Sequence, residues 1–357
     1  MVILGSTGSI GVNALNIARR FNLEVEALTA NGNIELLNRQ IAEFNPKFVA
    51  IGDASKKELV KHDRVFTGED GILKLLELSS SKKVVNALVG FAGLKPTLKA
   101  LELNRDLALA NKESLVIAGK FINTSKIVPI DSEHFGLWYL LGSKKPNKLY
   151  INASGGAFRD WDIEKIANAK LADALKHPNW AMGQKITIDS ASMVNKLFEL
   201  LEARWLFDTT NIDAVIERSS IVHALVEFVD GTTTAQLSGT DMKLPIAYAI
   251  LDRVTKPILE PLNLLDLNAI KFEEIKEQRY PIWQIKQHLL ENPDMGVVLN
   301  GANEVAIDGF VNERYGFFKM VDLILNAYKK FDRASANSLE ELFEIDREVR
   351  DYTKGLM

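Results

Sequence analysis

The sequence contains no cysteine, and this absence removes several kinds of chemistry at once. Disulfide bonds, thiolate metal sites and a catalytic thiol are excluded, and with them the phosphorylating aldehyde dehydrogenases, which need a cysteine nucleophile. The chain also has no apolar run of the roughly eighteen residues that span a bilayer, and it begins without a basic and apolar leader. Its net charge of −4 gives no electrostatic reason to bind nucleic acid or membranes. We therefore expect a cytoplasmic protein with neither kind of partner.

The stretch VILGSTGSIG at residues 2–11 contains three regularly spaced glycines, Gly5, Gly8 and Gly11. An apolar run precedes Gly5, and apolar residues with helical spacing follow Gly11, which predicts a strand, a tight turn and a helix. Such a turn lets the backbone approach a ligand, and the start of the helix suits a pyrophosphate. The spacing G-x-x-G-x-x-G departs from the usual dinucleotide fingerprint, so an ordinary strand-to-helix turn is the alternative interpretation.

The order of the predicted elements indicates an α/β protein of several domains. Strands and helices alternate over residues 1–125, which predicts a doubly wound, Rossmann-like dinucleotide-binding domain. From Lys126 onward we expect strands in KIVPIDSEH, KLYINASGGAF and KITIDSASM, and a hairpin at Asp230-Gly231. These elements predict an α+β catalytic domain over residues 126–252. A proline-punctuated linker over 253–281 and a helical domain over 282–357 complete the prediction.

Three carboxylates could hold a metal ion. Asp131 and Glu133 stand two residues apart at the end of a predicted strand, and an extended backbone would point both side chains to one side. Converging carboxylates suit a hard cation such as Mg²⁺ or Mn²⁺. An exposed acidic turn is the alternative for this pair alone, and Glu199 strengthens the metal interpretation as a third carboxylate.

A phosphate site is predicted on the stretch DSASMVNKLFELLEARWLF. We expect a helix that begins near Ser190 and carries Asn195, Lys196 and Glu199 on one side. A surface ion pair between Lys196 and Glu199 would be the purely structural alternative. Hydroxyl, amide and ammonium donors near a helix start would instead suit a phosphate group, with Glu199 at its inner edge.

Four further residues extend this site. Ser154, in the glycine-flanked turn of INASGGAF, could meet the same phosphate. Segment 177–183 carries His177 and Trp180 and is typical of a loop that closes over a substrate, although a surface histidine and a core tryptophan are the alternatives. Lys112 follows the predicted strand DLALAN and would face the nicotinamide of a dinucleotide. His62 and His288 are interpreted as structural.

The motifs GSTGSIG, ANKES, DSEH, ASGGAF, HPNW, DSASMVNK and LNGANE occur in this order, and with them the chain closely resembles the 1-deoxy-D-xylulose 5-phosphate reductoisomerase family. The resemblance implies the conversion of 1-deoxy-D-xylulose 5-phosphate to 2-C-methyl-D-erythritol 4-phosphate in the non-mevalonate route to isoprenoids. It also implies NADPH and a divalent cation (Mg²⁺, Mn²⁺ or Co²⁺) as cofactors, a sugar phosphate as substrate, and a homodimer.

The resemblance also implies a role for each matching residue. The dinucleotide would contact Thr7, Gly8, Ser9, Ile10, Asn33, Asn111, Glu113 and Gly183. The cation would bind Asp131, Glu133 and Glu199. The substrate phosphate would bind Ser154, Ser190, Asn195 and Lys196, while Lys112, Ser132, Glu133, His177 and Glu199 would contact the rest of the substrate. The catalytic set would be Lys112, Asp131, Glu133, His177 and Glu199.

The chemistry that the resemblance implies has two stages. The cation would chelate two neighbouring oxygens of the hydroxyketone while the carbon skeleton breaks and rejoins, most simply by a retroaldol and aldol sequence. Hydride from NADPH would then reduce the branched aldehyde phosphate. Closure of segment 177–183 would exclude water meanwhile.

One position departs from the commonest pattern of the family. After the second strand many members carry a lysine, arginine or serine beside the adenosine 2'-phosphate, whereas this chain has Gly32 in ANGN. No acidic residue directly follows that strand to take a ribose 2'-hydroxyl, which favours NADPH over NADH. The alternatives to the whole interpretation are a metal-free NAD(P)-dependent reductase of a small phosphorylated aldehyde and a nucleotide-sensing regulator without turnover.

Overall fold

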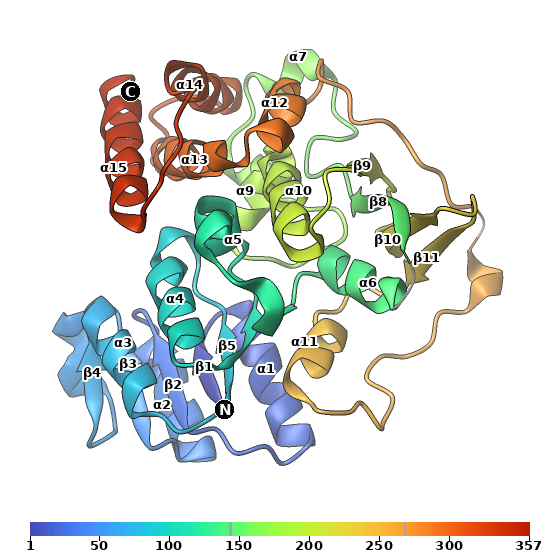
Figure 1. Cartoon of the computed structure of the whole chain (residues 1–357). Coiled ribbons are helices and arrows are strands. Elements are labelled where there is room, and N and C mark those ends of the chain that lie inside the picture. Colours follow the sequence, from blue (N-terminus) through green and yellow to red (C-terminus); the bar gives the residue numbers. More distant parts are fainter. Residues whose placement is uncertain (143–144, 268) are drawn as a thin grey trace. The chain divides into compact units, whose positions relative to one another are not determined.

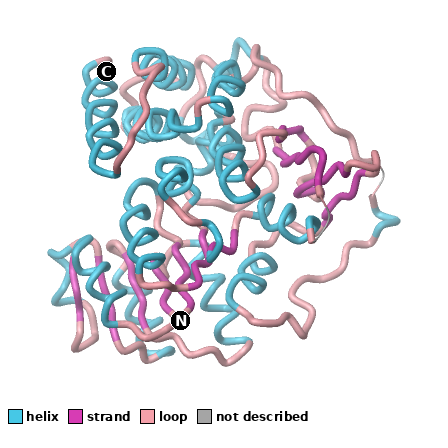
Figure 2. The backbone as a smooth tube through the Cα atoms, viewed as in Figure 1, coloured by secondary structure: helices cyan, strands magenta, loops and turns pink. Residues whose placement is uncertain are grey.

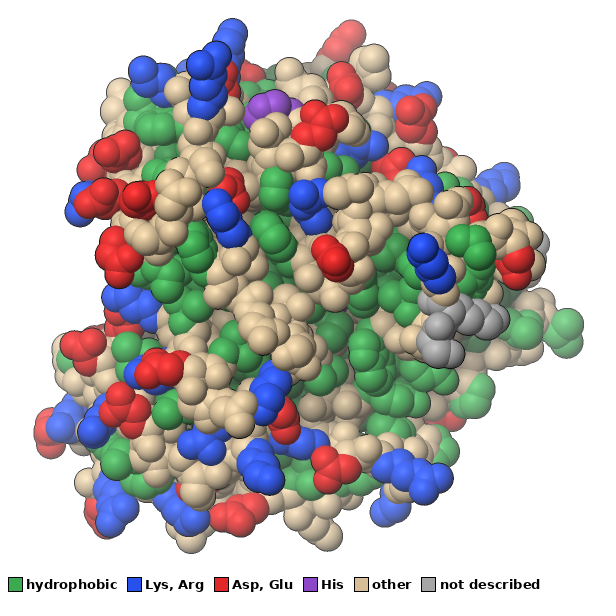
Figure 3. All heavy atoms as spheres, in the orientation of Figure 1, with side chains coloured by type: hydrophobic (Ala, Val, Ile, Leu, Met, Phe, Trp, Pro, Cys, Tyr) green, Lys and Arg blue, Asp and Glu red, His purple; other side chains and the backbone are tan. Residues whose placement is uncertain are grey.

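The computed structural model describes residues 1–142, 145–267 and 269–357 (Figures 1 and 2), and these residues form two compact units. Unit 1 comprises residues 1–114, 123–135 and 241–260, and unit 2 comprises residues 115–122, 136–240 and 261–357. Helices α5 (Lys112–Ala118) and α6 (Ser132–Leu141) begin in unit 1 and end in unit 2. Figure 3 shows basic and acidic side chains interspersed on the face drawn, as the small net charge leads one to expect.

Unit 1 is built on a seven-stranded parallel sheet whose order is β4-β3-β2-β1-β5-β6-β7. Its strands are β1 (Val2–Leu4), β2 (Ala27–Ala30), β3 (Phe48–Ile51), β4 (Val65–Thr67), β5 (Lys83–Asn86), β6 (Asp106–Leu109) and β7 (Ile127–Pro129). The central strands are short apolar runs that are buried throughout, as expected for a parallel sheet covered on both faces. The strand order reverses at β1, so ligands are expected beyond the carboxyl end of that strand.

The helices of unit 1 cover this sheet. Helices α1 (Ser9–Arg20), α2 (Ile34–Phe44) and α11 (Lys243–Ile250) share one apolar core with the strands. Helices α3 (Gly68–Leu78) and α4 (Leu94–Glu102) pack against each other and against strands β3 and β6. The predicted doubly wound fold is confirmed.

Unit 2 combines a mixed four-stranded sheet with helices. The sheet order is β11-β10-β8-β9, formed by β8 (Pro146–Ala153), β9 (Ile212–Ile216), β10 (Val222–Phe228) and β11 (Thr233–Leu237). Strands β8 and β9 are parallel, whereas β10 is antiparallel to both β8 and β11. Gly231 adopts φ +82° in the predicted hairpin between β10 and β11.

The helices of unit 2 include the predicted helical C-terminal region. They are α7 (Ile163–Ile166), α8 (Leu171–Ala174), α9 (Gln184–Ser192), α10 (Val194–Phe207), α12 (Lys286–Glu291), α13 (Gly296–Val311), α14 (Phe317–Lys330) and α15 (Leu339–Gly355). Helix α13 is buried along most of its length and packs against both α14 and α15. In the part of the chain that the structure describes, no helix is both long and apolar enough to cross a membrane.

Three local expectations were wrong. The stretch KITIDSASM is helix α9 rather than a strand, because polar and apolar residues alike are buried there and the apparent alternation carries no information about faces. Asp131 directly precedes helix α6, and Glu133 lies in its first turn, rather than both lying in an extended strand. Ser190 lies in the last turn of α9 rather than at a helix start, and α10 begins only after Met193, whose φ is +73°.

The boundaries of the units also differ from simple sequence blocks. Strand β7 pairs with β6, so the parallel sheet extends beyond residue 125. Segment 241–260, with helix α11, belongs to unit 1. The division into four domains at residues 125, 252 and 281 stays a prediction.

Candidate active site

The glycine turn after β1 has the features of a dinucleotide-binding loop. Gly5 adopts φ +81°, and a Cβ there would lie 2.6 Å from the carbonyl oxygen of Ala87. A Cβ on Gly11 would lie 2.3 Å from the Gly5 carbonyl oxygen. Helix α1 follows with Gly8 as its N-cap, no side-chain cap and no acidic residue in its first turn. This helix start therefore offers N–H groups and a positive dipole end to a phosphate.

Polar contacts fix the shape of this turn from behind. The Ser6 hydroxyl donates to Gln40 Oε1 over 2.7 Å, and Gln40 Nε2 donates to the Ser6 carbonyl over 2.8 Å. Both side chains are buried, whereas Gly8 and Ser9 are exposed and Thr7 and Ile10 are half-buried. The predicted cofactor residues 7–10 thus form the accessible side of a rigid turn. Asn33 caps helix α2 by accepting the Leu36 N–H over 3.2 Å.

The turn after β6 is held by buried hydrogen bonds. Asn111 Nδ2 donates to the carbonyl oxygens of Leu88 and Gly90 over 3.0 and 2.9 Å, and to Glu113 Oε2 over 3.1 Å. The Ser114 hydroxyl donates to Asn111 Oδ1. Asn111 and Glu113 therefore tie together the turns at the carboxyl ends of β5 and β6, where a dinucleotide on this sheet is expected.

Asp131, one of the acidic pair Asp131 and Glu133 in unit 1, is kept ionised by its neighbours. Its carboxylate forms an ion pair with Lys112, and its Oδ1 lies 3.5 Å from His134 Nδ1. Burial raises the pKa of Asp131, but the Lys112 ammonium and His134 outweigh it and hold that pKa well below the ordinary value. Asp131 is therefore an anion at neutral pH. The Ser132 hydroxyl donates to Glu133 Oε2 over 2.5 Å, next to this anion.

In unit 2, the glycine turn after β8 lies against the end of helix α9. Gly155 and Gly156 adopt φ +90° and +68°, and a Cβ on Gly156 would lie 2.5 Å from the Ser190 carbonyl oxygen. A side chain at position 156 would separate these segments. The structure therefore brings Ser154 and Ser190 into one neighbourhood, as the predicted phosphate site requires.

His177 is bound to Ser154 in a defined tautomer. The backbone N–H groups of Asn179 and Trp180 donate to His177 Nδ1 over 3.2 and 2.9 Å. Nδ1 is thus an acceptor, so the proton lies on Nε2, which donates to Ser154 Oγ over 2.8 Å. Burial, with the nearby Arg159 and Lys196 cations, lowers the pKa of His177 to about 4. His177 is therefore a neutral donor at physiological pH.

Helix α10 carries a buried polar cluster of Asn195, Lys196 and Glu199 in its first two turns. Asn195 Nδ2 and Lys196 Nζ both donate to the Glu199 carboxylate, and Lys196 also donates to the Asn152 carbonyl oxygen. Lys196 is 4% exposed and Glu199 is 1% exposed. The pair is therefore a buried one, and the interpretation as a surface ion pair is wrong.

Segment 177–183 is held by hydrogen bonds near its start and is exposed to solvent at its end. Asn179 Nδ2 donates to the Arg218 carbonyl oxygen and to Ser220 Oγ, each over 2.7 Å. The half-buried Trp180 ring contacts His223 edge-on at 6.1 Å between centroids. Gly183 is exposed and caps helix α9. Trp180 thus has a packing partner, and its role as part of a lid stays a prediction.

Sequence reasoning missed three groups at these sites. Arg159 Nη1 donates to the carbonyl oxygens of Ser154 and Arg218 over 3.1 and 2.7 Å, and so supports the turn that carries Ser154. Asn303, in the motif LNGANE, donates to Asp189 Oδ1 over 2.7 Å inside unit 2. His134 could have been found, because it stands three residues after Asp131 on what proved to be a helix.

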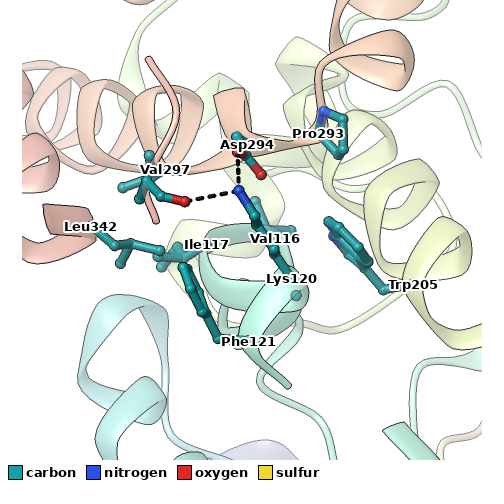
Figure 4. Close-up of a pocket in the computed structure, with 11 residues that line it drawn as sticks. Val116, Ile117, Lys120, Phe121, Trp205, Pro293, Asp294, Val297 and Leu342 are labelled. Carbon is teal, nitrogen blue, oxygen red and sulfur yellow. Dashed lines mark hydrogen bonds and ion pairs between the residues drawn. The ribbon is translucent and has the colours of Figure 1, made fainter. Parts of the chain in front are cut away.

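Outside these sites, the described residues form a small cavity in unit 2, lined from α5, α10 and the C-terminal segments (Figure 4). Its volume is about 10 Å³, which is room for about one water molecule. Lys120 Nζ donates to Asp294 Oδ2 over 3.1 Å and to the Ala336 carbonyl oxygen over 2.9 Å at its edge. The cavity is too small for a substrate.

His62 and His288 make the structural contacts expected of them. His62 Nε2 lies 2.9 Å from the Pro46 carbonyl oxygen, and its Nδ1 accepts the Arg64 N–H over 3.0 Å. His288 Nδ1 lies 3.0 Å from the Tyr328 hydroxyl. Both histidines thus hold local structure together.

Comparison with known proteins gives a consistent match along the chain. Residues 1–119 match the family model for 1-deoxy-D-xylulose 5-phosphate reductoisomerase, and residues 127–207 and 237–352 match two models for C-terminal domains of that enzyme. Relatives of the same name include one from Nautilia profundicola, 58% identical over 99% of both chains, and one from Campylobacter hominis, 55% identical over 99% of both.

Solved structures are similar over the same length. A DOX-P reductoisomerase in complex with NADPH, fosmidomycin and magnesium superposes with a TM-score of 0.93 at 32% identity, covering 99% of this chain and 97% of the other. The 1-deoxy-D-xylulose 5-phosphate reductoisomerase of Zymomonas mobilis in complex with NADPH gives a TM-score of 0.89 at 30% identity, covering 99% and 98%.

Proposed function

The chain belongs to the 1-deoxy-D-xylulose 5-phosphate reductoisomerase family, and from that membership we propose which of its residues perform each part of the reaction. The protein is an NADP-dependent oxidoreductase that converts 1-deoxy-D-xylulose 5-phosphate to 2-C-methyl-D-erythritol 4-phosphate with NADPH and a divalent cation. The observation that carries this conclusion is the 58% identity to a reductoisomerase over 99% of the chain. A metal-free reductase is not favoured, because a related structure contains magnesium.

Asp131, Glu133 and Glu199 are the proposed ligands of the cation. The donor set fits a hard ion, because it consists of carboxylate oxygens and Asp131 is kept ionised by Lys112 and His134. When bound, such a cation supplies Lewis-acid activation and a template for two neighbouring oxygens of the substrate. Lys112 orients Asp131. Lys196 neutralises the charge of the buried Glu199 until the substrate and the cation bind.

Ser154, Ser190, Asn195 and Lys196 are the proposed phosphate-binding residues. Support comes from the close approach of the turn at Gly156 to Ser190 and from the donors of Asn195 and Lys196 in the first turn of α10. A phosphate dianion would replace part of the pairing between Lys196 and Glu199, which frees the carboxylate for the cation. Neutral His177 positions the Ser154 hydroxyl and, with Lys112 and Ser132, contacts the rest of the substrate.

NADPH is proposed to bind along the carboxyl ends of the strands of unit 1. The glycine turn fits a pyrophosphate, because glycines at positions 5 and 11 let the turn pack closely on neighbouring backbone, where side chains would collide, and the start of α1 has no side-chain cap. The proposed contacts are Thr7, Gly8, Ser9, Ile10, Asn33, Asn111 and Glu113, with Gly183 from unit 2. Segment 177–183 would exclude water from the reacting carbons.

A homodimer in the cytoplasm is the proposed form of the enzyme, without nucleic-acid or membrane partners. Unit 2 exposes several large apolar side chains, among them Leu265 at 92% and Val229 at 70%, and such residues mark association surfaces when they cluster. Light scattering should give the mass of two chains. A single-chain mass at micromolar concentration would contradict this part of the proposal.

The reaction is tested by following NADPH oxidation with 1-deoxy-D-xylulose 5-phosphate before and after chelation. We expect turnover with Mg²⁺ or Mn²⁺, none in chelator, and recovery when the cation is returned. A small phosphorylated aldehyde serves as the control substrate, because the metal-free reductase would reduce it in chelator. Turnover of that aldehyde, but not of the sugar phosphate, would overturn the assignment.

A further inference from the structure

The turn after β2 lacks the charge that usually distinguishes the two nicotinamide coenzymes. On this fold the end of the second strand faces the adenosine ribose, where an acidic side chain takes the 2'-hydroxyl of NADH or a basic one takes the 2'-phosphate of NADPH. Here Ala30 is followed by Asn31, Gly32 and Asn33. None of these side chains carries a charge, so the preference for a coenzyme must come from elsewhere.

The structure places a lysine from another segment at this turn. Lys56 lies in the 3₁₀ helix Ala54–Leu59 that follows β3, the strand beside β2. Its Nζ donates to the Gly32 carbonyl oxygen over 3.2 Å. It also lies 3.0 Å from the point that a Cβ on Gly32 would occupy. The ammonium group of Lys56 therefore stands where a basic residue at position 32 would begin.

Lys56 retains the capacity to bind an anion. An ammonium group has three donors, of which one serves the Gly32 carbonyl and another faces Asp53 Oδ2 at 3.4 Å. The Lys56 side chain is 42% exposed, so a ligand can reach it. The nearby start of helix α2 adds a positive dipole end to the same neighbourhood, part of which Glu35 in its first turn offsets.

Asp53 is the competing group, because a carboxylate here could accept the 2'-hydroxyl of NADH. Its Oδ1 already accepts the N–H of Ser55 over 3.2 Å and the hydroxyl of Ser55 over 2.5 Å. These bonds cap the 3₁₀ helix and hold Asp53 in a structural role. Of these two charged groups, Lys56 is therefore the one available to the coenzyme.

We propose that Lys56 binds the 2'-phosphate of NADPH and supplies the coenzyme specificity that the residue at position 32 does not. This inference rests on the proposed use of NADPH. It assigns the specificity to a residue that is distant in sequence from the glycine turn. Because Lys56 and a side chain at position 32 would reach the same place, an arginine at position 32 should substitute for Lys56.

Direct binding to the full-length enzyme tests this assignment without turnover. Titration calorimetry, without substrate or cation, gives the Kd of NADPH and of NADH for the wild type and for Lys56→Gln. A charge-assisted hydrogen bond at a partly exposed site predicts NADPH binding about tenfold weaker in the variant, with NADH binding unchanged. The fragment 2',5'-ADP should lose affinity in parallel with NADPH, whereas 5'-AMP should not.

Two further variants separate specificity from structure. Lys57→Gln removes the neighbouring exposed lysine of the same 3₁₀ helix and should leave both coenzymes unaffected. Adding Gly32→Arg to Lys56→Gln should restore most of the NADPH affinity, because the side chain at position 32 would meet only the flexible end of residue 56. Equal loss of NADPH and NADH in Lys56→Gln would indicate that Lys56 merely holds the turn, and would overturn the inference.

An unchanged NADPH affinity in Lys56→Gln would also overturn it. Either of these results leaves the proposed function standing, provided that the wild type binds NADPH. Failure of the wild type to bind NADPH at all would instead contradict the proposed function. The two failures are therefore distinguishable in the same titration series.

Discussion

Replacing Lys196 by alanine should damage both the stability of unit 2 and the binding of substrate. Lys196 and Glu199 form an ion pair in which both side chains are at most 5% exposed. Removing one partner of a buried pair leaves an uncompensated charge, which costs roughly 3 to 5 kcal/mol of folding free energy. With a urea dependence of about 2 to 3 kcal/mol per molar, the unfolding midpoint should fall by about 1 to 2 M.

Tryptophan fluorescence is the assay for this stability. All five tryptophans (Trp138, Trp161, Trp180, Trp205 and Trp283) lie in unit 2, so their emission follows the unfolding of that unit. Lys165→Ala is the matched control, because Lys165 pairs with Asp162 at the same i,i+3 spacing on the surface. The control should leave the midpoint unchanged.

The double variant Lys196→Ala/Glu199→Gln shows whether the lost stability comes from the unpaired charge of Glu199 or from the loss of the Lys196 side chain itself. It should recover most of the lost stability, because the unpaired charge is gone, yet it should still bind substrate poorly. NADPH affinity should stay near that of the wild type in both Lys196 variants. The reasoning is refuted if Lys196→Ala lowers the midpoint no more than Lys165→Ala does, or if substrate and NADPH affinity fall equally.

Three other predictions concern single residues. The folded state lowers the pKa of His177 from its ordinary value of 6.5 to about 4, so between these pH values the unfolded chain binds a proton that the folded chain does not, and unit 2 should lose stability as the pH falls from 6.5 to 4. His177→Gln should flatten this part of the stability profile measured by tryptophan fluorescence, and an unaltered slope would contradict the buried environment described for His177. Gly11→Ala places a Cβ against the backbone of Gly5 and Ser6 and should weaken NADPH binding at least tenfold in calorimetry, while a normal affinity would argue against a pyrophosphate at this turn. Trp180 emission should change when a phosphonate hydroxamate analogue binds with metal, as judged against Trp180→Phe, and a signal indifferent to every ligand would make Trp180 a core anchor.

Features fixed by local chemistry were predictable from the sequence. Helix α2 (Ile34–Phe44) shows the apolar spacing of a helix with one buried face, with Asn33 as its cap and Asn45 in the left-handed conformation at its end. The strand, glycine turn and helix at residues 2–20 followed from the same kind of signal, because glycine tolerates close backbone approach.

Features fixed by long-range packing were not predictable. Helix α9 is buried by segments that are distant in sequence, among them those that carry Gly156 and Asn303. It therefore has no single apolar face, and the spacing of its apolar residues does not reveal that it is a buried helix. Lys56 lies 24 residues after Gly32, and only the pairing of β2 with β3 brings the two together. The buried state of Lys196 likewise depends on Asn152 at the end of β8.

The role of the three carboxylates is the central claim, and Glu199→Gln tests it most directly, because this change keeps the shape of the side chain and removes its charge. Mn²⁺ is titrated into the wild type and the variant while NADPH oxidation with 1-deoxy-D-xylulose 5-phosphate is followed. We predict that the variant is less stable, because the buried Lys196 then lacks its anionic partner, but stays folded in the absence of denaturant, binds NADPH and loses nearly all turnover, with partial rescue at high Mn²⁺. Full activity of the variant at ordinary metal levels, or of the wild type in chelator, would contradict the account.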